Sequence, residues 1–358
     1  MSMPTMTPAP TTDADERDDA ANAPVTTETT PTRTTVEGTP PPADWAEAGK
    51  ADPRQKVVTV IFNPVSGQGD PEERKKRIED ALAEHGYRTQ HLITTKEQGA
   101  RFFAEQALKD GVDLLAVSGG DGTVVEVASA LIGTNVPLAI FPAGTGNLLS
   151  VNLNIPTEVP AGVHAALFGT KRSLDLARLR IDDTGKEHFF AIIAGAGYDA
   201  SVIRDADREA KNKLGMFAYV WAALKNLDKK PVRTTIRLDG SETPLVRMAK
   251  SVMVANMGRL QGGVEIVPGA DPQSGMLEVA VLKADSLTAW AGLAWSAVTS
   301  QLRDEKYIEY RRARRVEVEM TFPQPFQYDG EDVGLVTRFS AEIVPGAVQV
   351  MVPKDAPV

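Results

Sequence analysis

Three short glycine-containing segments of the sequence could form a binding site for nucleotide phosphates. They are residues 63–67 (NPVSG), 119–123 (GGDGT) and 142–147 (PAGTGN), and each comes at the end of an apolar, β-rich run. Small residues with free N–H groups between a strand and a helix N-terminus bind anions. Each segment alone is also compatible with an ordinary tight turn. Three such loops after three strands of one sheet favour a nucleotide-phosphate site.

Two carboxylate-bearing motifs add chemistry to these loops. Asp121 lies among the glycines of the second segment, where an acid could hold Mg²⁺ or a substrate hydroxyl, or simply cap its turn. Asp329-Gly330-Glu331 near the C-terminus reads, taken alone, as a hairpin turn. The sequence contains no GxxxxGK[ST] segment and no HRD or DFG signature, which argues against P-loop and protein-kinase handling of a nucleotide.

The segments that would position the loops alternate between strands and helices. The pattern predicts strands at 57–64, 88–94, 113–120 and 137–144, and helices from Pro71 to about His85, at 97–109 and at 123–132. This order indicates a doubly wound parallel sheet, whose ligands bind at the carboxyl ends of its strands. All three glycine loops are expected at that edge.

After about Ser173 the pattern changes to short β-rich segments separated by turn residues. It predicts an antiparallel sandwich or a partly closed barrel. The expected strands are 174–181, 187–194, 232–238, 249–256, 264–267, 276–283, 314–321 and 335–342. Two amphipathic helices are expected at 208–227 and 287–303.

Together these motifs resemble the diacylglycerol kinase catalytic domain of the lipid kinase superfamily, which includes bacterial diacylglycerol kinases and sphingosine and ceramide kinases. Further matching segments are RSLDLARL (172–179), FAIIAGAGYDA (190–200), KNKLGMFAYVWAAL (211–224), GGVEIVPGADPQSGMLEV (262–279) and YDGE (328–331). The resemblance covers residues 56–350. GGDGT alone would also fit NAD kinases and phosphofructokinases.

The resemblance implies functional roles for particular residues. Glu331 matches the family's general base, and Asp121 would lie beside Mg²⁺–ATP. Asp199, in GYDA, is the candidate for touching the acceptor headgroup, and Thr95 is an alternative to Thr94 in the nucleotide site. The implied ATP contacts are Asn63, Pro64, Val65, Ser66, Gly67, Thr94, Gly119, Gly120, Asp121, Gly122, Thr123, Val124, Val125 and Thr145.

The sequence departs from the bacterial diacylglycerol kinase pattern at two positions. Leu148 follows Asn147 where those enzymes usually have an aspartate, which leaves the acceptor open. Ser274 stands where bacterial relatives usually place an aspartate that helps to bind a structural Mg²⁺. Asp271 is close enough in sequence to keep that metal site in question.

Composition and charge divide the chain before the first strand. Residues 1–52 hold ten acidic and three basic residues, and so account for most of the net charge of −9. They are rich in Thr, Pro and Ala, which predicts a disordered tail. We therefore expect this tail, an ATP-binding domain at 53–172 and a β-rich lipid domain at 173–358, with the last strand returning to the first domain. The absence of cysteine excludes disulfide scaffolds, thiol nucleophiles and iron–sulfur clusters.

The resulting hypothesis is an ATP- and Mg²⁺-dependent lipid kinase that converts diacylglycerol to phosphatidic acid. The alternatives are a sphingoid-base or other lipid kinase, an NAD kinase-type enzyme and a non-catalytic lipid-binding regulator. The acidic composition argues against a nucleic-acid partner. Without a signal peptide or an apolar span, we expect a cytoplasmic protein that contacts the membrane peripherally, with a homodimer left open. The candidate membrane contact combines Trp290 and Trp295 with Lys306, Arg311, Arg312, Arg314 and Arg315.

Overall fold

The structure is a computed structural model that describes residues 56–67, 69–182, 184–197, 230–259, 267–283 and 308–356. The chain divides into two units, Met1–Ala51 and Asp52–Val358, and every described residue belongs to the second. The predicted disordered tail at 1–52 and the predicted helices at 208–227 and 287–303 therefore lie outside the described residues.

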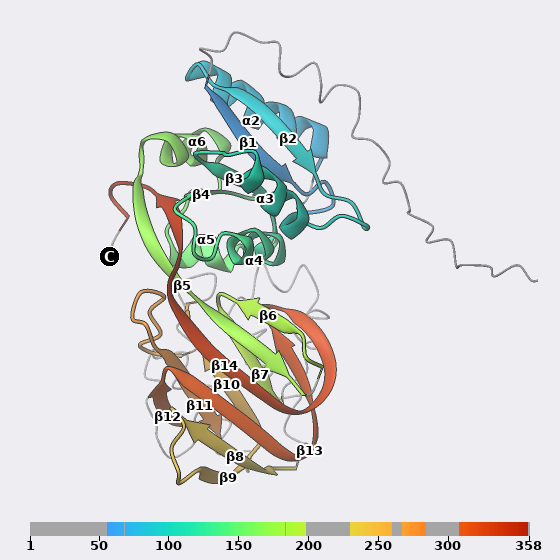
Figure 1. Cartoon of the computed structure of the whole chain (residues 1–358), viewed down its shortest axis with the longest axis vertical. Helices are drawn as coiled ribbons and strands as arrows, with labels where there is room; N and C mark the ends of the chain where they lie inside the picture. Colours follow the sequence, from blue (N-terminus) through green and yellow to red (C-terminus); the bar gives the residue numbers. More distant parts are fainter. Residues whose placement is uncertain are drawn as a thin grey trace, which may run out of the picture. The chain divides into compact units, whose positions relative to one another are not determined.

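The first lobe, residues 56–168, contains the predicted parallel sheet (Figure 1). Its strands are β1 (Val57–Phe62), β2 (Arg88–Ile93), β3 (Leu115–Gly119) and β4 (Leu138–Pro142), in the order β2-β1-β3-β4. Their side chains are almost continuously buried in β1, β3 and β4, because helices cover both faces of a parallel sheet. The doubly wound fold class predicted from the sequence is confirmed.

Helices pack on both faces of this sheet. One face is covered by α2 (Pro71–Glu84) and α6 (Val159–Phe168), and the other by α3 (Ala100–Lys109), α4 (Asp121–Ala130) and α5 (Leu148–Asn152). The start of α2 is the one that the sequence predicts: Pro71 is in the first turn, and Asp70 accepts a hydrogen bond of 2.9 Å from the Glu72 N–H. α5 and α6 were not predicted.

The second lobe is an antiparallel β-sandwich. Its strands include β8 (Val232–Leu238), β9 (Leu245–Ala249), β10 (Ser251–Ala255), β11 (Leu277–Leu282), β12 (Ile308–Ala313) and β13 (Arg315–Tyr328). With β7 (Ile193–Ala196) and β14 (Glu331–Val352), these strands form a central sheet in the order β12-β11-β10-β7-β13-β14, and β8 pairs with β13 and β9. The core between the strands is built from Val, Leu, Ile, Ala and Phe side chains.

Two predicted strands are wrong in detail, because each is two strands. The segment 187–194 divides into β6 (Glu187–Phe190) and β7 (Ile193–Ala196), which pair with different neighbours. The segment 249–256 is likewise interrupted at Lys250, between β9 and β10. β12 was not predicted, and residues 264–266 of a predicted strand lie outside the described residues.

Two long strands run from one lobe into the other. β5 (Thr170–Ile181) and β14 (Glu331–Val352) pair antiparallel along most of their length (Figure 1). The end of β14 also pairs with β4 in parallel, with Val350 opposite Leu138. The C-terminal strand thus adds to the sheet of the first lobe, and both lobes share one continuous sheet.

Candidate active site

The first two glycine loops meet at the carboxyl ends of the adjacent strands β1 and β3. The Asn63 N–H donates to the Ser118 carbonyl at 2.9 Å, and Asn63 Nδ2 donates to Thr123 Oγ1 at 2.8 Å. In return, the Gly120 N–H donates to Ser66 Oγ at 3.2 Å. Since α2 and α4 leave these strands toward opposite faces, the loops lie at the topological switch point where doubly wound sheets bind ligands.

Glycine is required where the third loop approaches the first two. Gly67 has φ +90°, and a Cβ on it would lie 2.3 Å from the Ala143 carbonyl oxygen. A Cβ on Gly144 would lie 2.8 Å from Gly120 Cα. The three loops predicted to converge therefore do so, with backbone against backbone.

The N-terminus of α4 supplies the strongest anion-binding feature at this edge. Gly120 is the N-cap, without a side-chain cap, and the Val124 N–H makes the first hydrogen bond of the helix, to the Gly120 carbonyl. The N–H groups of Asp121, Gly122 and Thr123 thus precede the first intrahelical bond. Such groups and the helix dipole attract phosphate.

Asp121 connects this helix to the third loop. Its Oδ1 accepts a hydrogen bond of 3.1 Å from the Leu149 N–H, at the start of α5. Burial raises the pKa of Asp121, while the N–H groups of residues 147–149 oppose that shift. Asp121 therefore has a structural role in addition to any role toward a metal or a nucleotide.

The Asp-Gly-Glu motif is a hairpin turn that also faces the first lobe. Asp329 has φ 44° and Gly330 φ 87°, as a two-residue type I′ turn between β13 and β14 requires. The Asp329 carboxylate accepts hydrogen bonds from the N–H groups of residues 191–193, at 2.7–3.0 Å. Burial raises the pKa of Asp329 to about 7, the N–H groups oppose this, and the Asp121 charge adds to the rise.

Glu331 lies directly after this turn and is paired across the hairpin with Tyr328. Burial raises the pKa of Tyr328, and a hydrogen bond to Glu331 raises it further. The Tyr328 hydroxyl also lies 3.2 Å from His188 Nδ1, on β6. A phenol has one proton, so it bonds both neighbours if it accepts from the His188 N–H and donates to Glu331.

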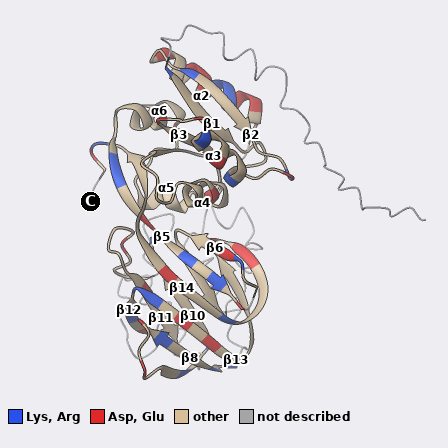
Figure 2. Cartoon of the chain, in the orientation of Figure 1, with Lys and Arg blue, Asp and Glu red and all other residues tan. Residues whose placement is uncertain are grey.

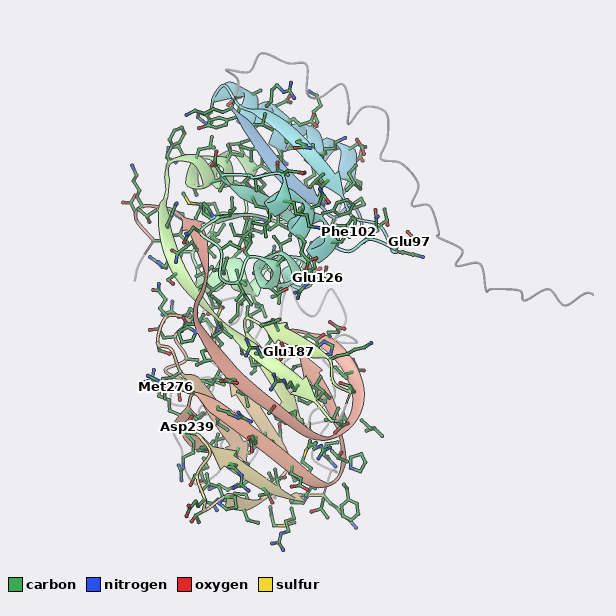
Figure 3. The ribbon with its side chains drawn as sticks, viewed as in Figure 1. Glu97, Phe102, Glu126, Glu187, Asp239 and Met276 are labelled. Carbon is green, nitrogen blue, oxygen red and sulfur yellow. The ribbon has the colours of Figure 1, made fainter. Side chains whose placement is uncertain are left out.

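A cavity of about 290 Å³ brings these groups together. It is lined by Gly122, Val125, Glu126 and Ser129 of α4, Arg101 of α3, Glu187, His188 and Phe189 of β6, and Tyr328, Asp329 and Glu331 at the hairpin. Figure 3 labels Glu126 on α4 and Glu187 on β6. The cavity thus joins the first turn of α4 to Glu331.

Several charges of this cavity are already engaged. Glu126 Oε2 accepts from the Ala100 N–H at 2.9 Å and so caps α3, and Arg101 donates to Glu105 at 3.0 Å. Glu187 pairs with Arg178 and Arg180. The sequence analysis did not select Glu126, His188 or Tyr328, although Glu126 lies one residue beyond the predicted contact Val125.

The remaining predicted nucleotide contacts differ in their surroundings. Thr94 follows β2, and its N–H donates to the Phe62 carbonyl at 2.9 Å, beside the end of β1. The Thr95 hydroxyl oxygen instead accepts N–H groups of its own turn, which favours Thr94 over Thr95. Val65 is almost fully exposed, whereas Val124 and Val125 are buried in the core. Asp199, the predicted acceptor contact, lies outside the described residues.

The turn that contains Ser274 holds itself together. Ser274 Oγ donates to the Asp271 carbonyl at 2.8 Å, and the Asp271 carboxylate accepts from the Gln273 N–H at 2.9 Å. The Asp175 carboxylate accepts the N–H groups of Gly275 and Gly346, both at 2.7 Å. Within the described ranges, no group of three or more His, Cys, Asp or Glu could hold a metal.

The basic residues considered for membrane contact are only partly described. Trp290, Trp295 and Lys306 lie outside the described residues. Arg311, Arg312 and Arg315 form ion pairs with Glu309, Glu278 and Glu317, respectively, and both signs of charge occur along the strands of the second lobe (Figure 2). In the part of the chain that is described, no helix is long and apolar enough to cross a membrane.

Comparison with known proteins matches both lobes. The family model described as the diacylglycerol kinase catalytic domain matches residues 57–179, and that of the YegS C-terminal NAD kinase beta sandwich-like domain matches residues 192–352. A diacylglycerol kinase of Mycobacterium tuberculosis is 29% identical over 302 residues, which cover 83% of this chain and 95% of that protein. A diacylglycerol kinase of Bacillus subtilis is 26% identical over 286 residues, 78% of this chain and 91% of that protein.

The fold is also found among solved structures. The crystal structure of a diacylglycerol kinase from Bacillus anthracis superposes with a TM-score of 0.63 at 23% identity, covering 85% of this chain and 98% of that chain. At this identity, the likeness bears on the fold alone.

Proposed function

Because the chain belongs to the diacylglycerol kinase-like family of lipid kinases, we propose that it transfers the γ-phosphate of ATP to the hydroxyl of a lipid alcohol. Diacylglycerol is the preferred acceptor, and phosphatidic acid the product. The observation that carries this proposal is the cavity in which the first turn of α4 and Glu331 come together. Phosphoryl transfer requires a clamp for the phosphates and a group that accepts the proton of the attacking hydroxyl.

The clamp is the edge formed by the three loops. The N–H groups of Asp121, Gly122 and Thr123 and the dipole of α4 bind phosphate oxygens, and Ser66 lies beside them through its bond with Gly120. These groups are held in place before the nucleotide arrives, so that binding requires little reorganisation.

The acidic groups at this edge fit a divalent cation. Asp121 and Asp329 both have raised pKa values, and the charge of Asp121 contributes to the rise at Asp329. Carboxylate oxygens are the ligands that Mg²⁺ prefers. Asp121 would hold such an ion with the phosphates of ATP, and the ion would neutralise charge on the transferred phosphoryl group.

Glu331 is the base of the proposed reaction. The acceptor hydroxyl gives its proton to a Glu331 carboxylate oxygen as the acceptor oxygen forms a bond to the γ-phosphorus. The bond between that phosphorus and the β–γ bridging oxygen breaks, and ADP carries the bridging oxygen away. The Tyr328 hydroxyl orients the Glu331 carboxylate during this step.

The charge of the cavity favours some acceptors over others. Among the described residues that line it, Glu126, Glu187, Asp329 and Glu331 are acidic and Arg101 is basic. Glu187 is paired with Arg178 and Arg180 and the pKa of Asp329 is raised, so the negative charge of Glu126 and Glu331 is what disfavours an anionic headgroup. Diacylglycerol carries no charge and fits this lining. A sphingoid base, whose amine is cationic, is the second candidate acceptor. Either lipid requires contact with a membrane surface, so we propose a cytoplasmic enzyme that binds the membrane peripherally.

Glu331→Gln tests the base. This variant should lower kcat by about 10²–10⁴-fold, because glutamine cannot accept the hydroxyl proton, while ATP binding stays unchanged. The matched control is Asp332→Asn, an exposed neighbour outside the cavity, which should keep its activity. Both are assayed with labelled ATP against diacylglycerol, a sphingoid base, phosphatidylglycerol and NAD⁺. Near-normal turnover in Glu331→Gln contradicts the assignment of the base, and labelled NADP⁺ without labelled lipid contradicts the proposed function.

A further inference from the structure

We propose that Arg74 is a positioning residue that shapes the first phosphate loop, 63–67, for the nucleotide. The inference rests on the proposed function, since it assigns ATP to that loop. Arg74 is on the first turns of α2, where its N–H donates to the Asp70 carbonyl at 3.1 Å. A basic residue on an amphipathic helix reads, in sequence alone, as part of a solvated face.

The guanidinium of Arg74 binds two backbone carbonyl groups of this loop. Nη2 donates to the Asn63 carbonyl at 2.7 Å, and Nη1 donates to the Ser66 carbonyl. The guanidinium carbon also lies 4.6 Å from the centre of the Phe62 ring, at the end of β1. One side chain therefore joins the last residue of the strand to both ends of the turn that follows it.

These contacts determine which backbone groups the loop presents to a ligand. Carbonyl oxygens repel phosphate, and Arg74 keeps the carbonyls of Asn63 and Ser66 turned toward itself. The same geometry holds Ser66, whose Oγ accepts the Gly120 N–H at the start of α4. Gly67 follows in the left-handed region, and a Cβ there would lie 2.9 Å from Arg74 Nη1. The positive charge of Arg74 next to the loop also favours the binding of a polyphosphate there.

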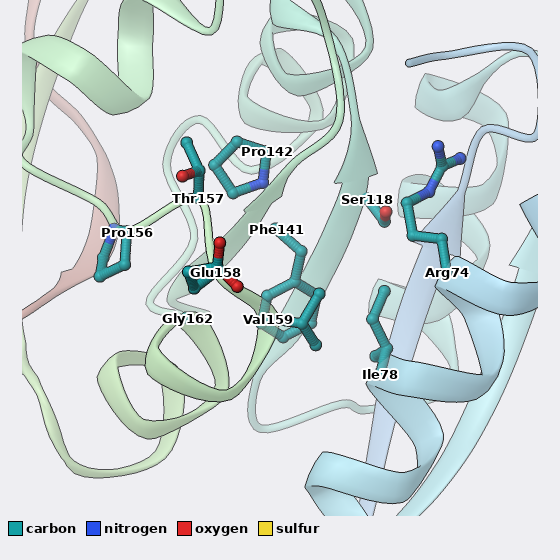
Figure 4. Close-up of a pocket in the computed structure, with 10 residues that line it drawn as sticks. All are labelled: Arg74, Ile78, Ser118, Phe141, Pro142, Pro156, Thr157, Glu158, Val159 and Gly162. Carbon is teal, nitrogen blue, oxygen red and sulfur yellow. The ribbon is translucent and has the colours of Figure 1, made fainter. Parts of the chain in front are cut away.

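Arg74 and Ser118 both line a small cavity (Figure 4). Arg74 Nε and Ser118 Oγ are buried there without a hydrogen-bond partner in the protein. The cavity measures about 10 Å³, which matches a single water molecule. A water molecule bonded to both Nε and Ser118 Oγ would hold the third nitrogen of the guanidinium and connect Arg74 to β3.

Lysine cannot reproduce this arrangement. A guanidinium donates in a planar fork to two carbonyls and stacks on an aromatic ring, whereas an ammonium is a point charge without a fixed plane. Arg74→Lys should therefore keep the charge and lose the geometry. Arg74→Gln should lose both.

The test measures ATP affinity separately from turnover. Arg74→Gln should raise the KM for ATP by about tenfold or more, and Arg74→Lys by less, because a hydrogen bond to a charged group contributes about this much. The kcat at saturating ATP should fall by less than the KM rises. The matched control is Arg77→Gln, three residues along α2, where the exposed Arg77 pairs only loosely with Glu158 at 3.7 Å. It should leave the KM unchanged.

Thermal unfolding with and without MgATP, in the absence of lipid, separates the possible failures. Wild type and Arg77→Gln should gain a similar rise in Tm from MgATP, and the Arg74 variants a smaller one. An Arg74→Gln protein with wild-type KM and Tm rise overturns the inference. If Arg74→Gln does not fold, Arg74→Lys carries the test, and a wild-type KM in that variant overturns it. A wild-type protein that gains nothing from MgATP overturns the proposed function instead.

Discussion

Glu331 has a carboxylate whose position depends on one neighbour. Tyr328, its partner across the hairpin, is largely buried and donates to it, while His188 holds the other side of the phenol. Glu331, the base of the proposed reaction, is therefore an exposed acid that is bonded to a buried tyrosine. Such an arrangement leaves the carboxylate open to the acceptor and limits its rotation, which general-base catalysis requires.

Tyr328→Phe removes that support and little else, because the ring still fills its place. We expect kcat to fall by about tenfold, the loss of one oriented hydrogen bond to a charged group, with the KM for ATP unchanged. The control is Tyr87→Phe, a tyrosine near Lys56 in the first lobe and outside the cavity. Measurement of kcat and both KM values decides the outcome. Equal kcat in wild type and Tyr328→Phe contradicts the positioning role.

At the scale of elements, the sheet of the first lobe was predictable because its signals are local. The apolar runs of β1, β3 and β4 and the Asp70–Pro71 start of α2 are complete within a few residues. α5 was missed because it has only five residues. Its N-cap, Asn147, has a left-handed backbone, and its first turn is held by a hydrogen bond to Asp121, which is distant in sequence. The length of β14 was missed because two of its partners, β5 and β4, are distant in sequence.

The candidate site shows the same division. The glycine loops and Asp-Gly-Glu can be recognised as motifs in the sequence. The Asp-Gly-Glu motif forms the hairpin turn that its residues predict, and the same turn lines the cavity. Arg74, Glu126 and His188 carry no motif, since each acquires its contacts only when separate elements pack. These three residues became candidates only when the structure showed which groups they contact.

An ion cluster on the second lobe connects three strands. The Glu309 carboxylate, on β12, pairs with Arg247 of β9 at 2.7 Å, with Lys283 at the end of β11 at 3.3 Å, and with Arg311. The hydrogen bond from Arg247, with those of Lys283 and the charge of Arg311, lowers the pKa of Glu309 to about 2 against the effect of burial. The stabilisation is present above the unfolded pKa near 4.5 and is lost as the pH falls to 2.

Glu309→Gln should lower the free energy of unfolding by about 1–3 kcal/mol at pH 7, a value reduced because the cations are partly exposed. The matched control is Glu317→Gln on β13, whose ion pairs with Arg315 and Arg237 are exposed, and which should change stability by less than about 1 kcal/mol. Urea unfolding at pH 7 and pH 3 measures both. The Glu309→Gln deficit should shrink at pH 3, and a deficit that persists unchanged there contradicts the ionic origin.

At the scale of the whole molecule, the two matched family domains share their cores. Val348, Val350 and Val352, at the end of β14, are fully buried in the same cluster as Leu115 of β3 and Leu138 of β4. Residues that are last in the sequence thus complete the sheet that is first in the sequence. A chain of this topology gains the stability of its first lobe only after β14 has paired with β5 and β4.

The catalytic-domain segment should therefore not fold by itself. A fragment of residues 56–182 lacks all of β14, and the three valines alone account for about 5 kcal/mol or more of burial free energy, comparable to the net stability of a domain. We expect the fragment to show no cooperative thermal transition by circular dichroism and no rise in Tm with MgATP. A chain ending at Pro353 keeps β14 and should melt like the full-length protein. A cooperative transition in the 56–182 fragment at the temperature of the intact chain would contradict this prediction. It would mean that the first lobe folds independently and that β14 adds little to its stability.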